Sequence, residues 1–195
     1  VTLAALTTTQ LSNISPTQLA ALTTTQLRGL ATTQIGSMSE SQLQALATTQ
    51  LAALTTRQVG ALTRTEIGFL RSTQLLTLSA TQLASLSTLA MTGLNADALD
   101  ALSTKQLAYF TATQMGAFTT TQVSAFKETQ LAAFTANEFS GLTSEAVSVL
   151  STVQLSGIKT SQLAALSLDA ITGLSSTQVA AFSTSQWAAL SGAQL

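Results

Sequence analysis

The sequence repeats every eight residues from one end to the other without a slip in register. Steps of eight from Gln10 to Gln194 define 24 octads, of which 18 carry Gln at this place, two carry Glu and four carry Ala. The next residue and the one three further on are large and apolar in every octad. A short strict period is typical of a protein whose neighbouring repeats share one core. We therefore predict a single repeat array over residues 1–195, cut from a longer array.

The residues before each apolar pair predict the start of a helix. Octad positions are counted here from the residue three before the Gln, so that residues 7–14 form one octad with Gln10 at octad position 4. Thr7 can accept a hydrogen bond from the backbone N–H of Gln10, while the Gln10 side chain reaches back to the N–H of Thr7, which is a capping box. The single proline, Pro16, falls at the first helical position, where a missing N–H costs nothing. We predict one capped helix of about two turns in each octad. The predicted caps include Thr7 with Gln10, Ser15 with Gln18, and Thr23 with Gln26.

Two apolar columns, which begin at Leu11 and Ile14, supply the predicted core. Burying both side chains of one octad yields about 4 kcal/mol, whereas ordering eight backbone residues costs at least about 8 kcal/mol. One octad cannot fold alone, so the columns must pack on neighbouring turns of a superhelix. The predicted fold class is all-α, a solenoid of very short capped helices with one helix per octad. Coils of two octads and coils of three octads both satisfy the pattern.

The competing fold is a β-solenoid, because Thr favours strands and inward Leu would suit short coils. The abundant Ala, Leu and Gln favour helices instead. Ten Gly and one Pro are also too few for the corners of about a dozen β-coils. The apolar residues are spaced three and five apart in turn, which conflicts with the alternation of a strand. We therefore favour the helical form.

The composition excludes most functional classes. The chain has no Cys and no His, which removes disulfides, thiolate sites, the commonest general base and the commonest metal ligand. A net charge of −1 supplies no field that would hold a nucleic-acid backbone. No apolar run approaches the ~18 residues of a membrane span. We expect a non-enzymatic chain with no cofactor, no metal site, no nucleic-acid partner and no membrane insertion.

Two surface features and one core feature could have a functional role besides a structural one. Rows of Thr at 7–9 and 119–121 present hydroxyl groups at regular intervals, which would suit a glycan or an ice surface, although caps account for most of them. Arg57, Arg64 and Arg71 lie seven apart and so shift across the octad, which favours a solvated surface over a phosphate track.

Four aromatic residues in the second apolar column are predicted to be core: Phe110, Phe118, Phe126 and Phe134.

The octads resemble the long Leu-Thr-Thr-x-Gln arrays of very large secreted proteobacterial proteins, which are called adhesins or haem utilization or adhesion proteins. Leu-Thr-Thr-Thr-Gln-Leu at 22–27 and Leu-Ser-Leu-Asp-Ala-Ile at 166–171 carry the resemblance, which extends over the whole chain. It implies a secreted or cell-surface stalk of a bacterium. The residues lend no support to a haem site, because His is missing and Met38, Met91 and Met115 occupy apolar columns.

The expected function is therefore that of a structural, non-catalytic stalk or spacer in a bacterial surface adhesin. One alternative is a self-assembling filament subunit whose copies stack head to tail. The other is a Thr-array surface that binds a glycan or ice.

Overall fold

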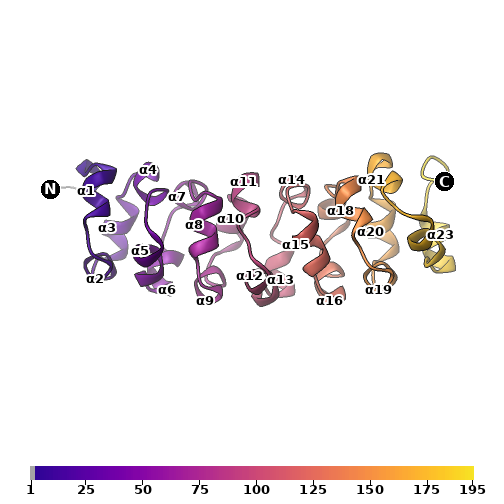
Figure 1. Cartoon of the computed structure of the whole chain (residues 1–195), viewed down its shortest axis with the longest axis horizontal. Coiled ribbons are helices and arrows are strands. Elements are labelled where there is room, and N and C mark those ends of the chain that lie inside the picture. Colours follow the sequence, from indigo (N-terminus) through magenta and orange to yellow (C-terminus); the bar gives the residue numbers. More distant parts are fainter. Residues whose placement is uncertain (1–2) are drawn as a thin grey trace. The chain divides into compact units, whose positions relative to one another are not determined.

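The computed structural model describes residues 3–195, and every regular element within them is helical (Figure 1). A 3₁₀-helix, η1 (Leu3–Ala5), precedes 23 α-helices in these residues, and no strand occurs among them. The predicted all-α fold with one helix per octad is confirmed, and the β-solenoid alternative is wrong. The α-helices are α1 (Thr8–Ser12), α2 (Pro16–Ala20), α3 (Thr24–Arg28), α4 (Thr32–Ile35), α5 (Glu40–Ala45), α6 (Thr48–Ala52), α7 (Thr56–Val59), α8 (Arg64–Phe69), α9 (Ser72–Leu75), α10 (Ala80–Ala84), α11 (Thr88–Met91), α12 (Ala96–Ala101), α13 (Thr104–Leu107), α14 (Ala112–Met115), α15 (Thr120–Ala125), α16 (Glu128–Leu131), α17 (Ala136–Phe139), α18 (Ser144–Ser148), α19 (Thr152–Ser156), α20 (Thr160–Ala164), α21 (Leu168–Thr172), α22 (Ser176–Ala180) and α23 (Thr184–Ala189).

The helices are shorter than the two turns that the sequence suggested. Each has four to six residues, which is about one to one and two-thirds turns. The reason lies in the linker, since the cap residue is extended, as at Ser79 (φ −71°, ψ 166°), and the residue before a cap can be extended too, as at Leu46 (φ −63°, ψ 131°). Two extended residues leave at most six of the eight for the helix. No helix in residues 3–195 is long and apolar enough to cross a membrane.

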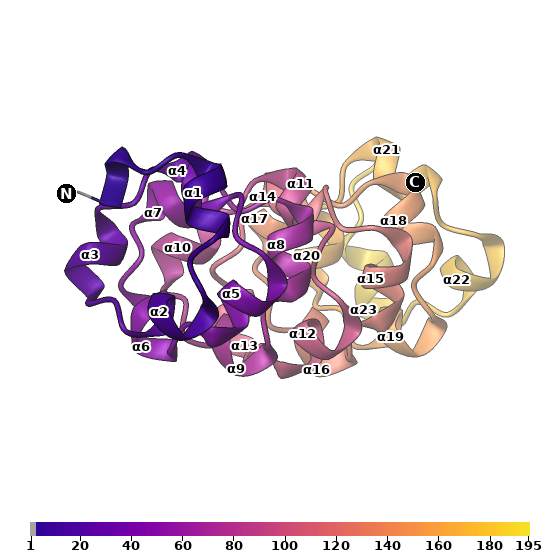
Figure 2. The same cartoon turned by 60° about the vertical axis from the view of Figure 1, so that its left-hand side comes forward.

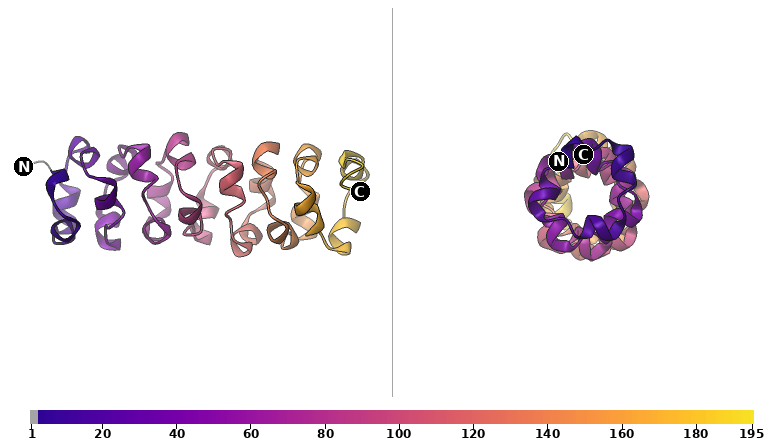
Figure 3. Two further views of the ribbon diagram at one scale, coloured as in Figure 1. Left: turned by 90° about the horizontal axis from the view of Figure 1, so that it is seen from above. Right: turned by 90° about the vertical axis from the view of Figure 1, so that its left-hand side faces the viewer.

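The chain divides into two compact units, Val1–Ala101 and Leu102–Leu195, and each is described by itself. In the first unit α1 packs against α4, α2 against α5 and α3 against α6, and the end-on view of Figure 3 shows these indigo and violet helices passing round a common axis. In the second unit α13 packs against α16, α14 against α17 and α15 against α18 (Figure 2). Each helix thus lies beside the helix three octads further along. One coil takes three octads, which decides between the two coil sizes that the sequence left open.

The two apolar columns form the core of each coil. Leu11, Leu19 and Leu27 at octad position 5 are buried, as are the following members of their column in the first unit. At octad position 8, Ile14 and Leu22 are only half-buried, because their coil has a neighbour on one side alone, and burial of this column begins with the next octad.

Aromatic residues show where octad position 8 points. In the second unit the ring centroids of Phe110 and Phe118 lie 5.8 Å apart, those of Phe118 and Phe126 lie 5.2 Å apart, and those of Phe126 and Phe134 lie 5.5 Å apart. All three pairs meet edge to face, the arrangement that the ring quadrupoles favour, and all four rings are buried. Residues eight apart can touch in this way only inside the coil, so octad position 8 lines its interior.

Stacked coils come closest at glycines of octad position 7. A methyl group on Gly141 would lie 1.8 Å from the carbonyl oxygen of Ala112, and one on Gly93 would lie 2.1 Å from that of Arg64. In both pairs the second residue stands at octad position 2, three octads earlier. Because no Cβ fits at such a distance, glycine sets the spacing between these coils.

We expect Gly141→Ala to lower the free energy of unfolding by about 3 kcal/mol, because the new methyl group must push two backbones apart. Gly157 provides a matched control at the same octad position, where the nearest atom to an added methyl group is the Cβ of Glu128 at 3.4 Å. Gly157 has helical φ and ψ (−81°, −10°), so Gly157→Ala should raise stability by about 0.5 kcal/mol through the unfolded chain. Thermal unfolding followed by circular dichroism measures both. Equal midpoints for the two variants would show that the close approach is not required.

Candidate functional site

The side chain at octad position 4 forms a capping box with the cap residue of its own octad. The backbone N–H of Gln10 donates to Thr7 Oγ1 at 3.1 Å, and the N–H of Thr7 donates to Gln10 Oε1 at 2.8 Å. Both hydrogen bonds satisfy N–H groups that a helix start leaves without partners. The same pairs of bonds join Ser15 with Gln18 and Thr23 with Gln26.

The Gln bond is kept even where the cap residue has no hydroxyl group. The N–H of Ala31 donates to Gln34 Oε1 at 2.7 Å, and the N–H of Lys159 donates to Gln162 Oε1 at 2.8 Å. The glutamine oxygen is therefore the more constant half of the capping box. The same single bond occurs at Ala47, Arg71 and Lys127.

The nitrogen of the same side chain bonds to the preceding coil. Gln42 Nε2 donates to the carbonyl oxygen of Leu11 at 2.9 Å and to that of Ile14 at 2.8 Å. The first acceptor lies in the last turn of a helix, where it also accepts from the N–H of Ile14 at 3.0 Å, and the second lies in the linker that follows this helix. One amide thus caps its own helix and closes the helix end four octads earlier.

This hydrogen bond recurs within both units. Eleven glutamines make it to the carbonyl oxygen 28 residues earlier, over 2.7–3.0 Å: Gln34, Gln42, Gln50, Gln58, Gln74, Gln82, Gln154, Gln162, Gln178, Gln186 and Gln194. We call this set the glutamine column.

The glutamines of octad position 4 become buried along the first unit. Gln10, Gln18 and Gln26 are exposed, and their Nε2 atoms have no hydrogen-bond partner within residues 3–195. Gln34 and Gln42 are only 2% exposed. The change falls at the fourth octad, as it must when three octads complete one coil.

Six octads lack the Gln. Glu66 accepts a hydrogen bond from the N–H of Thr63 at 2.9 Å, so the cap survives, but a carboxyl group carries no N–H for the carbonyl oxygens of Ile35 and Met38. Glu138 stands in the same position in the second unit. The other four octads carry alanine and have neither bond: Ala90, Ala98, Ala146 and Ala170.

An acidic residue precedes three of these alanines, in the first turn of the helix. The pKa of Glu145, next to Ala146, lies below its ordinary value because its carboxylate accepts a hydrogen bond from its own backbone N–H, and then from the hydroxyl groups of Thr143 and Ser144. A carboxylate in the first turn therefore takes over part of the capping role of the missing Gln. The other two such acids are Asp97 and Asp169.

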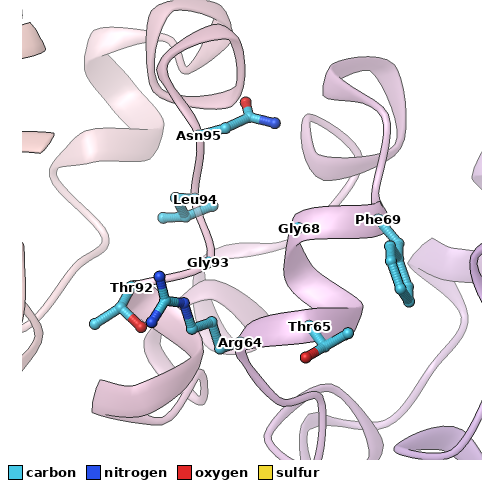
Figure 4. Close-up of a pocket in the computed structure, with 8 residues that line it drawn as sticks. All are labelled: Arg64, Thr65, Gly68, Phe69, Thr92, Gly93, Leu94 and Asn95. Carbon is cyan, nitrogen blue, oxygen red and sulfur yellow. The ribbon is translucent and has the colours of Figure 1, made fainter.

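One pocket in the first unit lies between Arg64 and Asn95. The pocket of Figure 4 has a volume of about 430 Å³, and its Arg64 and Asn95 side chains lie at opposite ends while Phe69 points away from both. Asn95 Oδ1 is already engaged by the N–H of Ala98 at 2.8 Å, as a cap. Among residues 3–195 no group of three or more potential metal ligands occurs.

The basic residues that lie seven apart in the sequence are not brought together. Arg57 lines one pocket with Arg28, and Arg64 lines the pocket of Figure 4. Arg71 Nη2 donates to the carbonyl oxygen of Gln44 at 2.7 Å.

The predicted hydroxyl rows are divided between caps and surface. Thr7 and Thr119 accept hydrogen bonds from the N–H of octad position 4, while the remaining threonines of both rows are exposed.

Comparison with known families identifies a repeat protein. The ALTTAQ repeat family matches residues 12–48. The six letters of that name correspond to octad positions 7, 8 and 1 to 4, and this chain reads Ala-Leu-Thr-Thr-Thr-Gln over 21–26. A search of curated proteins found no match. The similarity therefore supports a repeat architecture and assigns no activity.

Exchanging amide and carboxyl groups separates the two roles of octad position 4. Gln82→Glu keeps an oxygen for the N–H of Ser79 and removes Nε2, which donates to Ala52 O at 3.2 Å and Leu54 O at 2.7 Å. We expect it to lower the free energy of unfolding by about 2–4 kcal/mol, because buried carbonyl groups lose a donor and meet a carboxyl group instead. Gln18→Glu is the control within the same Ser-x-Thr-Gln-Leu-Ala sequence, and it should change stability by less than about 0.5 kcal/mol.

The reverse exchange should stabilise the chain. Glu66→Gln supplies an Nε2 that can donate to the carbonyl oxygens of Ile35 and Met38, and we expect a gain of about 1–3 kcal/mol. Equilibrium unfolding in urea measures all three variants. Equal losses in Gln82→Glu and Gln18→Glu, or a loss in Glu66→Gln, would contradict the role given to Nε2.

Proposed function

We propose that the chain is a structural, non-catalytic segment, a stalk or spacer within a secreted or cell-surface adhesin of a bacterium. Its resemblance to the Leu-Thr-Thr-x-Gln arrays of such proteins supports the location and the role. The match to a repeat family supports the more general statement that the chain is a repeat protein.

The observation that carries the proposal is the double hydrogen-bonding role of the glutamine column. Its side chains are the most regular polar groups of the sequence. In each one, as in Gln42, the oxygen accepts a hydrogen bond from the cap residue of its own helix, and the nitrogen donates to carbonyl oxygens of the preceding coil. Such a bond adds a coil to an array without requiring any group from outside the repeat. Length can therefore be set by the number of octads, which is the property that a spacer needs.

A tandem chain tests the spacer role. Residues 1–192 contain a whole number of octads, so residues 1–192 followed by residues 1–195 continue the eight-residue register across the junction. We expect the maximum dimension in small-angle X-ray scattering to grow roughly in proportion to the number of coils, as stacked helices a fixed distance apart require.

The control for this experiment is the same tandem chain without residues 189–192, which shifts the second half by four residues and takes its first glutamines out of register with their acceptors. We expect the shifted chain to unfold more readily at the junction. An in-register tandem that is no longer than the single chain would rule out the spacer role.

A second candidate function, self-assembly into a filament, is favoured by free hydrogen-bond donors in the first unit and free acceptors in the second. At one end, Gln10, Gln18 and Gln26 have unpaired Nε2 donors within the described residues. At the other, Trp187 is 39% exposed in the last coil. The linker carbonyl groups of this coil at octad position 8 receive no hydrogen bond from residues 3–195; they belong to Leu174, Phe182 and Leu190.

Light scattering over a wide range of protein concentration tests this candidate. In the register of the array, the three free glutamines of one copy would donate to the last coil of another, so the mean mass should rise with concentration. A triple variant with Glu at positions 10, 18 and 26 keeps the cap oxygens and removes the donors, and it should stay at constant mass. Constant mass for the unaltered chain would exclude end-to-end assembly.

A further inference from the structure

A pocket of about 340 Å³ in the first unit is lined by two arginine side chains and by no acidic residue. Arg28 ends α3, and Arg57 lies in α7, which belongs to a later coil. The two residues are 29 apart in the sequence, so only the coiling of the chain brings them to one pocket. Both are exposed.

The polar side chains of Gln58 and Thr55, which also line this pocket, are already occupied. Gln58 Nε2 donates to the carbonyl oxygens of Leu27 at 2.8 Å and Leu30 at 2.9 Å, and Gln58 Oε1 accepts from the N–H of Thr55 at 3.0 Å and from its hydroxyl group at 3.1 Å. These bonds belong to the fold and leave little hydrogen-bonding capacity for a ligand. The guanidinium groups and the hydroxyl group of Thr32 are the side-chain donors that remain.

Neither guanidinium group has a hydrogen bond or an ion pair within the described residues, in contrast to Arg71, whose Nη2 is held by the carbonyl oxygen of Gln44. Two positive charges that line one pocket repel each other, and a negative group between them would remove that repulsion. The planar guanidinium fork matches the paired oxygens of carboxylate, sulfate and phosphate. The volume lies at the lower end of the range for ligand pockets, which suits a single charged group or one sugar unit.

We propose that the pocket between Arg28 and Arg57 binds an oxyanion, a sulfate, phosphate or carboxylate group, either as a free ion or as a substituent of an acidic polysaccharide. The guanidinium group of Arg28 approaches it from one coil and that of Arg57 from another. The proposal is independent of the stalk role, since a spacer works with or without such a site.

Isothermal titration calorimetry at low ionic strength tests the proposal with three probes: inorganic sulfate, dextran sulfate and uncharged dextran. We expect the chain to bind at least one of the sulfated probes and not the uncharged polymer. Arg28→Gln and Arg57→Gln should each weaken that binding about tenfold, because each removes a charge-assisted hydrogen bond. Arg64→Gln is the matched control, since it removes the same charge from the same unit but lines a different pocket, and it should weaken binding less than about twofold.

Binding of inorganic sulfate and of dextran sulfate, or of inorganic sulfate alone, supports the site and assigns it to a free ion or an exposed anionic group. Binding of dextran sulfate alone, with loss in Arg28→Gln and Arg57→Gln, supports it and assigns it to a polymer. Equal weakening by all three variants would show general charge attraction and overturn the site, as would the absence of binding to either sulfated probe. Because both arginines are exposed, unchanged circular dichroism spectra of the variants exclude misfolding as the cause.

Discussion

The amide side chain at octad position 4 works in two directions at once. Its oxygen accepts from the N–H of the cap residue three positions earlier, and its nitrogen donates to carbonyl oxygens 28 to 31 residues earlier. Local helix formation and coil stacking therefore depend on the same group. A helix of four to six residues is too short to persist alone in water, so the array is held by what joins one coil to the next.

Where the amide is missing, the coils meet in other ways. Three of the six octads without Gln have a glycine at octad position 7: Ala90 is followed by Gly93, and Glu138 by Gly141. In the third such octad Gly173 allows an approach of 2.1 Å, measured from an added Cβ to a carbonyl oxygen of the coil before. Direct backbone contact thus replaces the side-chain bond there.

Residue types and spacing were sufficient to predict the caps and the apolar columns, because both depend on residues that lie close together within one octad. They did not decide the coil size, which depends on how helices stack across 24 residues. The bond from Nε2 was also missed, although the sequence carried a signal for it. A capping box accepts Glu as readily as Gln, and the helix dipole favours the acid, yet Gln outnumbers Glu by 18 to two. That bias indicates a need for a donor. Nothing in the sequence indicated that Arg28 and Arg57 line one pocket, because residues 29 apart come close only when the length of the coil is known.

Hydrogen exchange of the glutamine side-chain amides, followed by nuclear magnetic resonance, tests the central claim most directly. The account predicts that the Nε2 protons of Gln42 and Gln82 exchange far more slowly than those of Gln10, Gln18 and Gln26, which have no partner in the described chain. Protection that is the same for buried and exposed glutamines, at the rate of a free amide, would contradict it. The coils would then be held by their apolar side chains alone.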